Sequence, residues 1–399
     1  MQTLEQLRNG ELKGCRHLKL TQALETFPEE IFTLADSLEV LDLSDNQLTA
    51  LPDDLSRLRH LKILFASNNN FQHFPEGIGG CSALEIVGFK HNQIHHLSET
   101  CLPRTLRWLI LTDNDIVRLP ESIGSLGKLE KLALAGNRIG FLPDSFQQLT
   151  QLGLLRISAN QLAEFPAVTL TLPKLAWFAF AGNPFCAPRQ THADFPLVDA
   201  EALALTETLG RGASGIISRA YWQSLEQQEI LQSEQWVAVK VFHGDVTSDG
   251  YPEDELDACL SVPAHKNLVT AMARINANNM SALVMELIPA HYQNLGQPPS
   301  LQSCTRDTFT QGQRFSSRQV EHMVRQMRSI VSHLEQAEVC HGDLYAHNTL
   351  IDAEGNILFG DFGAASRYEY LSAQQKQGIR TIERRALDHF IDDLHGLIP

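Results

Sequence analysis

Several protein classes are excluded by what this 399-residue sequence lacks. No uninterrupted apolar run approaches the roughly 20 residues that a membrane-spanning helix requires. Basic residues are also scarce: the formal net charge is -15, and no long run of Lys or Arg occurs. Because nucleic acids and anionic membranes both bind clusters of positive charge, neither is expected as a partner.

Cysteine is present without any pattern that would give it a structural or metal-binding role. The seven cysteines are an odd number, lie far apart, and include no Cys-x-x-Cys pair. A disulfide framework is therefore not expected, and a reducing compartment fits best. The opening stretch, "MQTLEQLRNGELKGCRHLKL", also has no unbroken apolar core of the kind found in signal peptides. These features favour the cytoplasm and leave delivery into a host cell open.

A repeat runs through the first half of the chain, which with 43% hydrophobic residues has the composition of a folded protein. The stretch "LEVLDLSDNQLTALP", beginning at Leu38, recurs six more times with an Asn at a step of 22 or 23 residues. The repeated asparagines are Asn46, Asn69, Asn92, Asn114, Asn137, Asn160 and Asn183. We expect Leu41, Leu43, Leu48 and Leu51 to point into a continuous core, and the Asn side chains to bond unpaired turn backbone.

Residues 14 to 186 of the sequence resemble the leucine-rich repeat, an α/β solenoid. Strand alternation predicts that the outward positions of each short strand form one concave face. On that face we expect Phe65, Trp108, Ile110 and Trp177 to be exposed. An exposed apolar row is typical of a site for a protein partner, although strand propensity alone also favours apolar residues there.

A glycine-rich element opens the second half of the sequence. Gly210, Gly212 and Gly215 stand in "GRGASG", and the residues after it, "IISRAYW", indicate a second strand and not a helix. This pattern favours a hairpin whose backbone N–H groups lie over phosphates. The strand "WVAVKVF" follows, with Lys240 in its middle, and then the predicted helix "PEDELDACLS".

Further motifs follow in a fixed order. "ALVMELI" is followed by an amphipathic helix over "SSRQVEHMVRQMRSIVSHLEQ". Next come His341-Gly342-Asp343-Leu344 with Asn348, a predicted hairpin turning at "AEGN", and Asp361-Phe362-Gly363. Residues 204 to 399 therefore resemble a protein kinase domain, which is an α+β fold of two lobes.

The resemblance implies ATP and Mg²⁺ as substrate and cofactor, and it implies a role for each matching residue. Lys240 would bind the α- and β-phosphates, and Met285 and Glu286 would lie at the nucleotide pocket. Asp343 would accept the substrate's hydroxyl proton, while Asn348 and Asp361 would hold Mg²⁺. The acid that orients Lys240 stays open among Glu253, Asp254, Glu255 and Asp257; the register from His265 favours Glu255, and the remainder are expected to be solvated.

Several positions depart from the kinase pattern. Gly342 stands where many kinases carry Arg, Tyr345 where Ser/Thr kinases carry Lys, and His347 where tyrosine kinases carry Arg. Only 36 residues follow Gly363, so we expect a shortened C-lobe in which "TIERRALDHFIDDLHGLI" is one helix. Candidate self-modification sites in the segment after Gly363 are Ser366, Tyr368, Tyr370, Ser372 and Thr381; the alternative for each, which we favour, is an ordinary surface residue.

The sequence thus predicts a repeat solenoid over 1–186, a linker or cap over 187–203, and a kinase-like domain over 204–399. The pattern is similar to that of bacterial leucine-rich-repeat protein kinases. We expect transfer of the γ-phosphate of ATP to protein hydroxyls, Ser or Thr by default, with the repeats selecting a partner. Two alternatives stay open. One is a pseudokinase scaffold that acts through its repeats. The other is a small-molecule phosphotransferase, because the His-Gly-Asp form of this sequence is similar to that of aminoglycoside phosphotransferases.

Overall fold

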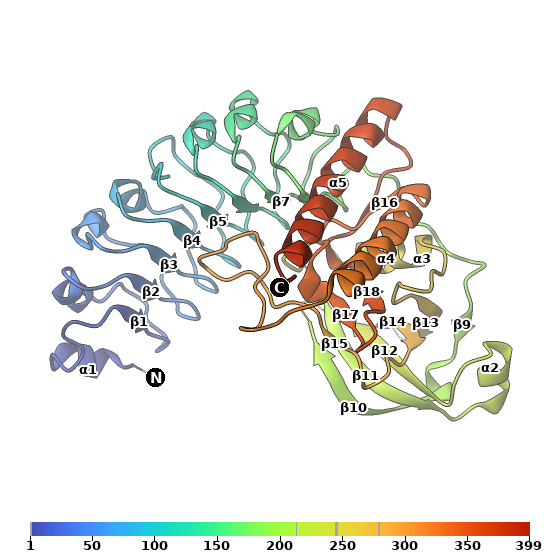
Figure 1. Ribbon diagram of the computed structural model, residues 1–399. Helices are drawn as coiled ribbons and strands as arrows, with labels where there is room; N and C mark the ends of the chain where they lie inside the picture. Colours follow the sequence, from blue (N-terminus) through green and yellow to red (C-terminus); the bar gives the residue numbers. More distant parts are fainter. Residues whose placement is uncertain (1, 213, 244–245, 278–279) are drawn as a thin grey trace. The chain divides into compact units, whose positions relative to one another are not determined.

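The computed structural model describes residues 2–212, 214–243, 246–277 and 280–399. Residue contacts divide the chain into two units (Figure 1). Unit 1 holds residues 1–175 and 183–185, and unit 2 holds residues 176–182 and 186–399. Ala213, in the glycine-rich element, lies outside the described residues.

Unit 1 is the predicted leucine-rich-repeat solenoid. A short helix, α1 (Leu4–Arg8), precedes the repeats, and each following repeat adds one three-residue strand to a parallel sheet in chain order. The strands of unit 1 are β1 (His17–Lys19), β2 (Val40–Asp42), β3 (Ile63–Phe65), β4 (Ile86–Gly88), β5 (Trp108–Ile110), β6 (Lys131–Ala133) and β7 (Leu154–Arg156). The next strand along the chain, β8 (Trp177–Ala179), belongs to unit 2. The 3-10 helices of the repeats are η1 (Glu29–Leu34), η2 (Leu55–Arg57), η3 (Glu76–Gly80), η4 (Glu121–Ser125), η5 (Asp144–Gln148) and η6 (Ala167–Thr171).

The repeated asparagines form the expected ladder. In Asn69, Oδ1 accepts a hydrogen bond from the N–H of Leu48 at 2.9 Å, and Nδ2 donates to the carbonyl of Leu43 at 3.0 Å. The other six asparagines repeat this pattern one turn of the solenoid apart. The predicted inward positions Leu41, Leu43 and Leu48 are fully buried. The stacked copies thus share one core, and side-chain amides satisfy the turn backbone.

The outward strand positions of unit 1 are partly exposed where the sequence predicts an apolar row. Phe65, Trp108 and Ile110 are each half-buried. The Phe65 ring packs directly against Gly88. A Cβ atom at that glycine would lie only 2.8 Å from the ring. Lys131 places its Nζ 4.1 Å from the centre of the Trp108 ring, an arrangement that the electron-rich ring face favours.

Unit 2 is built around a six-stranded sheet in the order β10-β11-β12-β14-β13-β9. Its strands are β9 (Leu197–Val198), β10 (Leu203–Arg211), β11 (Gly215–Trp222), β12 (Trp236–Phe242), β13 (Ala271–Ala277) and β14 (Met280–Glu286). Its neighbours are antiparallel except for β13 and β9, and a core that includes Trp222, Val239 and Val284 lies on the sheet. The connections carry η7 (Ala200–Ala202), α2 (Leu225–Ile230) and α3 (Pro252–Ser261).

The remainder of unit 2 is mainly helical, with α4 and α5 in contact. Its elements are β15 (Gln293–Asn294), α4 (Ser317–Gln336), β16 (Val339–Cys340), η8 (Ala346–Asn348), β17 (Thr349–Ile351), β18 (Ile357–Phe359), η9 (Phe362–Ala364), β19 (Ser366–Arg367) and α5 (Ala373–His395). The amphipathic stretch predicted as a helix is α4, which begins at a capping box of Ser316 and Gln319. The predicted hairpin is β17–β18.

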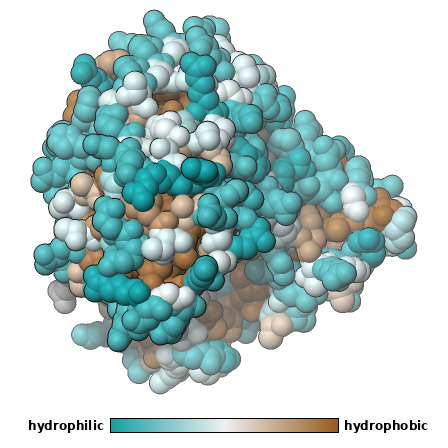
Figure 2. All heavy atoms as spheres, turned by 90° about the vertical axis from the view of Figure 1, so that its left-hand side faces the viewer, coloured by the Kyte–Doolittle hydropathy of each residue, from teal (hydrophilic) through white to brown (hydrophobic). Residues whose placement is uncertain are grey.

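No helix within the described ranges has both the length and the apolar character needed to cross a membrane. On the face drawn in Figure 2, hydrophilic residues predominate, and hydrophobic residues gather in separate areas between them. None of the seven cysteines, all of which lie in the described ranges, forms a disulfide bond.

Candidate active site

A cavity of about 800 Å³ lies in unit 2, and most of the residues expected around a nucleotide line it. The lining residues from the predicted set are Gly210, Gly212, Gly215, Lys240, Glu255, Met285, Glu286 and Asp361. The glycines belong to the β10–β11 hairpin, whose tip is closed by a 2.9 Å bond from the Gly212 N–H to the Gly215 carbonyl. A Cβ atom at Gly215 would lie 2.4 Å from the Val241 carbonyl oxygen, so only glycine fits there.

Lys240 and Glu255 form an ion pair in the wall of this cavity. Lys240 lies in β12, between β11 and β14, and its Nζ bonds Oε1 of Glu255 on α3. The two side chains are only 12% and 5% exposed. Burial raises the pKa of Glu255 above its usual range, against the opposite effect of Lys240. The pair holds the ammonium group at the cavity in one position.

The other acids near Glu255 are not all solvated, contrary to the sequence-based expectation. Asp254 accepts a 2.5 Å bond from Arg189. Asp257 is buried and accepts bonds from Arg367 at 2.5 Å and from His192 at 2.6 Å. Their partners come from more than 60 residues away, so the local sequence could not reveal them.

Asp343 and Asn348 lie together on the loop between β16 and β17. Nδ2 of Asn348 donates to Oδ2 of Asp343 at 2.8 Å and to its carbonyl at 3.0 Å. His341, fully buried, bonds the Gly360 carbonyl through Nε2 at 3.0 Å and packs on Phe359. These contacts join the loop to the end of β18.

Asp361 lies two residues after the last residue of β18, in the left-handed backbone region with φ of 63°. Its Oδ1 accepts a 3.3 Å bond from the Gly363 N–H. The β17–β18 hairpin also brings the Gly360 N–H to the Asn348 carbonyl, at 3.3 Å. The amide oxygen of Asn348 and the carboxylate of Asp361 are hard oxygen donors, the kind that Mg²⁺ prefers.

Asp307 is a site residue that the sequence does not reveal. Its side chain is 2% exposed and accepts bonds from the Ala346 N–H at 2.5 Å and from Nδ1 of His347 at 2.6 Å. Burial alone would lower the pKa of His347, but the bond to Asp307 raises it above the usual value. Asp307 lies in the polar segment after β14, which has no recognisable motif, so no signal in the sequence identifies it.

We expect replacement of Asp307 by Asn to loosen this loop. An amide keeps the shape of the side chain but loses the charge that strengthens both bonds, so the free energy of unfolding should fall by about 1–3 kcal/mol. Chemical denaturation measures this loss. The exposed Asp392→Asn serves as the matched control and should stay within about 0.5 kcal/mol of the wild type. Equal stability of the two variants would contradict a bracing role for Asp307.

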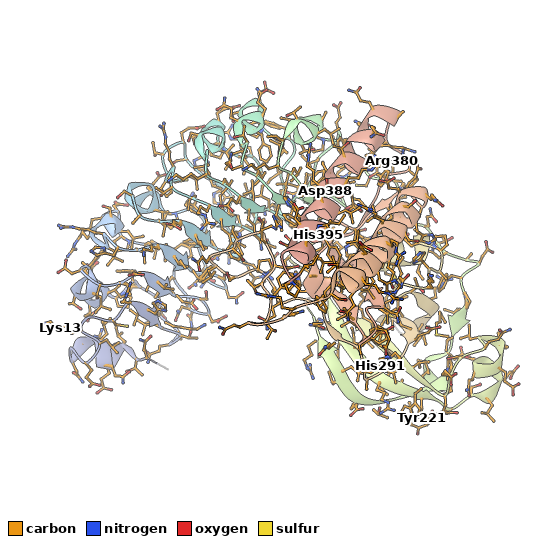
Figure 3. The ribbon with its side chains drawn as sticks, in the orientation of Figure 1. Lys13, Tyr221, His291, Arg380, Asp388 and His395 are labelled. Atoms are coloured by element: carbon orange, nitrogen blue, oxygen red, sulfur yellow. The ribbon has the colours of Figure 1, made fainter. Side chains whose placement is uncertain are left out.

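The structure explains why position 342 is Gly and not the Arg that many kinases carry there. Its φ is +70°, and a Cβ atom there would lie 2.6 Å from the Ala364 carbonyl oxygen and 2.7 Å from that of Phe178. Its N–H donates a 2.9 Å bond to Oε1 of Glu383, a buried residue of α5. Arg380, Asp388 and His395, labelled in Figure 3, mark the course of this helix. Burial raises the pKa of Glu383 to about 7.

Two further sequence-based expectations, on Trp177 and on the candidate modification sites, are wrong in part or in full. Trp177 is not exposed: it is 2% exposed, because it stacks on Tyr345 with ring centres 4.6 Å apart. Ser366 and Tyr368 are buried and so are not accessible modification sites, whereas Ser372 and Thr381 are exposed. The helix predicted near the end of the sequence is confirmed as α5, although it begins eight residues earlier than Thr381, at Ala373, and ends at His395.

Comparisons with protein families agree with both units. Residues 203–387 match the family described as protein tyrosine and serine/threonine kinase, and residues 16–71 and 104–162 match the leucine-rich repeat. The chain therefore consists of a leucine-rich-repeat solenoid and a kinase-like domain.

Curated relatives resemble only part of the chain. Human NUAK family SNF1-like kinase 2 is 28% identical over 41% of this chain and 23% of its own length. The rice plant intracellular Ras-group-related LRR protein 8 is 32% identical over 33% of this chain and 30% of its own. The adenylate cyclase of Schizosaccharomyces pombe is 34% identical over 32% of this chain and 8% of its own. The chain thus spans less than a third of the length of these relatives.

Among solved structures, a leucine-rich-repeat protein of Leptospira interrogans is similar to this chain. The two are 27% identical, with a TM-score of 0.37, over 45% of this chain and 52% of that one.

Proposed function

We propose that this chain is an ATP-dependent protein kinase that transfers the γ-phosphate to protein hydroxyls, Ser or Thr by default. The observation that carries the proposal is the Lys240–Glu255 ion pair in the wall of a cavity that the glycine-rich hairpin and Asp361 also line. A buried, oriented ammonium group beside backbone N–H groups is suited to a polyphosphate. The proposed kinase domain comprises residues 204–399.

Within the cavity, each group would contact one part of ATP. The backbone of the glycine-rich hairpin would cover the phosphates, and Lys240 would bind the α- and β-phosphates while Glu255 holds it in place. Met285 and Glu286, at the end of β14, would lie beside the base. The cavity volume of about 800 Å³ is within the usual range for a small-molecule site.

Asn348 and Asp361 would hold Mg²⁺. Because Nδ2 of Asn348 is bonded to Asp343, the amide orientation leaves its oxygen as the metal donor. Bound Mg²⁺ neutralises charge that develops on the phosphate oxygens during transfer.

Asp343 would act as the base for the acceptor hydroxyl. The hydroxyl oxygen forms a bond to the γ-phosphorus, the bond from that phosphorus to the β,γ-bridging oxygen breaks, and ADP leaves. The hydroxyl proton passes to the Asp343 carboxylate. Tyr345 is 4% exposed and stacked on Trp177, so it would not provide the phosphate contact that Lys makes in Ser/Thr kinases.

The repeats would bind a protein partner or substrate through the half-buried Phe65, Trp108 and Ile110 of unit 1. Aromatic side chains are frequent at the centres of protein interfaces, which supports this assignment. The lack of disulfide bonds among the described cysteines supports a cytoplasmic site of action.

Transfer of radiolabelled γ-phosphate by the purified full chain tests the proposal. With Mg²⁺ we expect labelling of the chain or of casein on Ser or Thr, and with EDTA we expect labelling to fall to background, because phosphoryl transfer needs the metal. Mapping of the labelled positions identifies the acceptor type. Binding of Mg-ATP without any transfer would favour a pseudokinase scaffold, and transfer only to a small molecule would favour the second alternative.

A further inference from the structure

The segment 176–182 is part of unit 2, and one tryptophan, Trp177, makes several of its contacts there. Nε1 of Trp177 donates a 3.1 Å hydrogen bond to the Leu344 carbonyl. Its ring stacks on Tyr345, with centres 4.6 Å apart and planes inclined by 7°, and on His389 of α5, at 5.2 Å and 17°. Trp177 therefore contacts the two residues that directly follow Asp343 and connects them to α5.

The same segment also holds the stretch that follows Asp361. Oγ of Ser366 accepts bonds from the N–H groups of Phe180 and Ala181 at 3.0 and 3.1 Å. The Phe178 carbonyl lies so close to Gly342 that no side chain fits there. Loop residues on both sides of Asp343 thus rest on the backbone or side chains of residues 177–181.

Because it makes these contacts, we propose that Trp177 is a positioning residue for the loop that carries Asp343. This inference rests on the proposed function. The indole fixes the loop at Leu344 by a directional bond and at Tyr345 by parallel stacking, which orients the peptide units next to Asp343. Trp177 itself does not touch the reacting atoms and acts only through the loop.

Tyr345 extends this arrangement to the far side of the loop. Its ring lies 4.9 Å from that of His347, which Asp307 holds by a 2.6 Å bond. The loop is therefore fixed between Trp177 at one side and Asp307 at the other, with Asn348 following directly. Loss of the Trp177 contacts should increase motion in the loop. The nucleotide cavity should stay unchanged, because neither Trp177 nor Tyr345 lines it.

The test compares Trp177→Phe with Trp222→Phe in the full chain. The two tryptophans are equally buried, at 2%, and each donates one indole hydrogen bond, Trp222 to Ser233 at 3.0 Å. Trp222 belongs to the core of the six-stranded sheet. Hydrogen–deuterium exchange of peptides covering 341–349 is measured in both variants, together with kcat and the KM for ATP in the transfer assay.

We expect exchange in 341–349 to be about fivefold faster in Trp177→Phe than in wild type, the loss expected for one hydrogen bond. The kcat should fall by a similar factor at an unchanged KM for ATP, while Trp222→Phe leaves exchange in 341–349 and kcat near the wild-type values. Trp177→Ala, which also loses the stacking, should give larger changes than Trp177→Phe in both measurements.

Unchanged exchange in 341–349 for Trp177→Phe would overturn the positioning role, whatever the activity. So would an equal increase in both variants, since that reflects general loss of stability. If the wild type transfers no phosphate to any acceptor, the proposed function fails. The exchange measurement still decides the positioning role in that case.

Discussion

Asp343→Asn should reduce kcat for phosphate transfer by roughly 10²–10⁴-fold, the usual contribution of a general base. Asparagine has the shape of aspartate but cannot accept the hydroxyl proton. The affinity for Mg-ATP should stay unchanged, because Asp343 is not among the residues that line the cavity. Single-turnover transfer and equilibrium binding of Mg-ATP measure the two quantities.

The matched control for this variant is Asp388→Asn. Asp388, labelled in Figure 3, is an exposed acid of α5, and its replacement should leave kcat within twofold of the wild-type value. If Asp343→Asn kept more than a tenth of the wild-type kcat, a group other than Asp343 would accept the hydroxyl proton. A large change in Mg-ATP affinity would instead assign Asp343 to nucleotide binding.

Glu383→Gln should remove a pH dependence from the stability of the folded chain. The pKa of Glu383 is raised from an ordinary value near 4.5 to about 7, first by burial and then by the nearby Glu335. Between these two values the folded state keeps a proton that the unfolded state has released. The free energy of unfolding therefore falls as pH rises from about 4.5 to 7 and levels off above that.

Glutamine is neutral at every pH and can still accept the bond from the Gly342 N–H. Glu383→Gln should therefore exceed the wild type in stability at pH 8, by up to about 3 kcal/mol, and match it near pH 4.5. Thermal unfolding of the wild type and the variant across pH 5 to 8 measures this difference in stability. The titration of other groups cancels, because both proteins contain the same other groups. A stability difference that does not vary with pH would show that Glu383 is charged in the folded state.

Glu383→Ala separates the hydrogen bond from the charge. It leaves the buried Gly342 N–H without its acceptor and creates a cavity, so stability should fall by about 2–4 kcal/mol at acidic pH. At that pH the wild-type side chain is protonated, and its charge contributes nothing. Stability equal to that of wild type at pH 5 would exclude a bracing role for this helix residue.

The parts of the molecule that the sequence predicts are those whose contacts are local or periodic. The asparagine ladder follows from a period of 22 or 23 residues, so each Asn contacts backbone one repeat away. Asn348 and Asp361 come together because a short hairpin joins them, and the hairpin is readable from its turn. Lys240 meets Glu255 across only 15 residues.

The parts that the sequence does not predict depend on distant contacts. Trp177 has the outward position of a repeat strand, and its burial comes from a loop 167 residues later. Asp307 contacts the loop 39 residues away, and Glu383 contacts it from 41 residues away, without any motif at either position. A polar residue that braces a loop in this way has the same local sequence as one in solvent.

The placement of residues 176–182 in unit 2 has a consequence for how the chain folds during synthesis. These residues leave the ribosome long before Leu344 and His389, the groups that cover Trp177. Unit 2 therefore cannot complete its packing until α5 has been made, because contacts of such large sequence separation form last. Until then the indole of Trp177 lacks these partners, so the loop that carries Asp343 gains its contacts with Trp177 and α5 only late in synthesis.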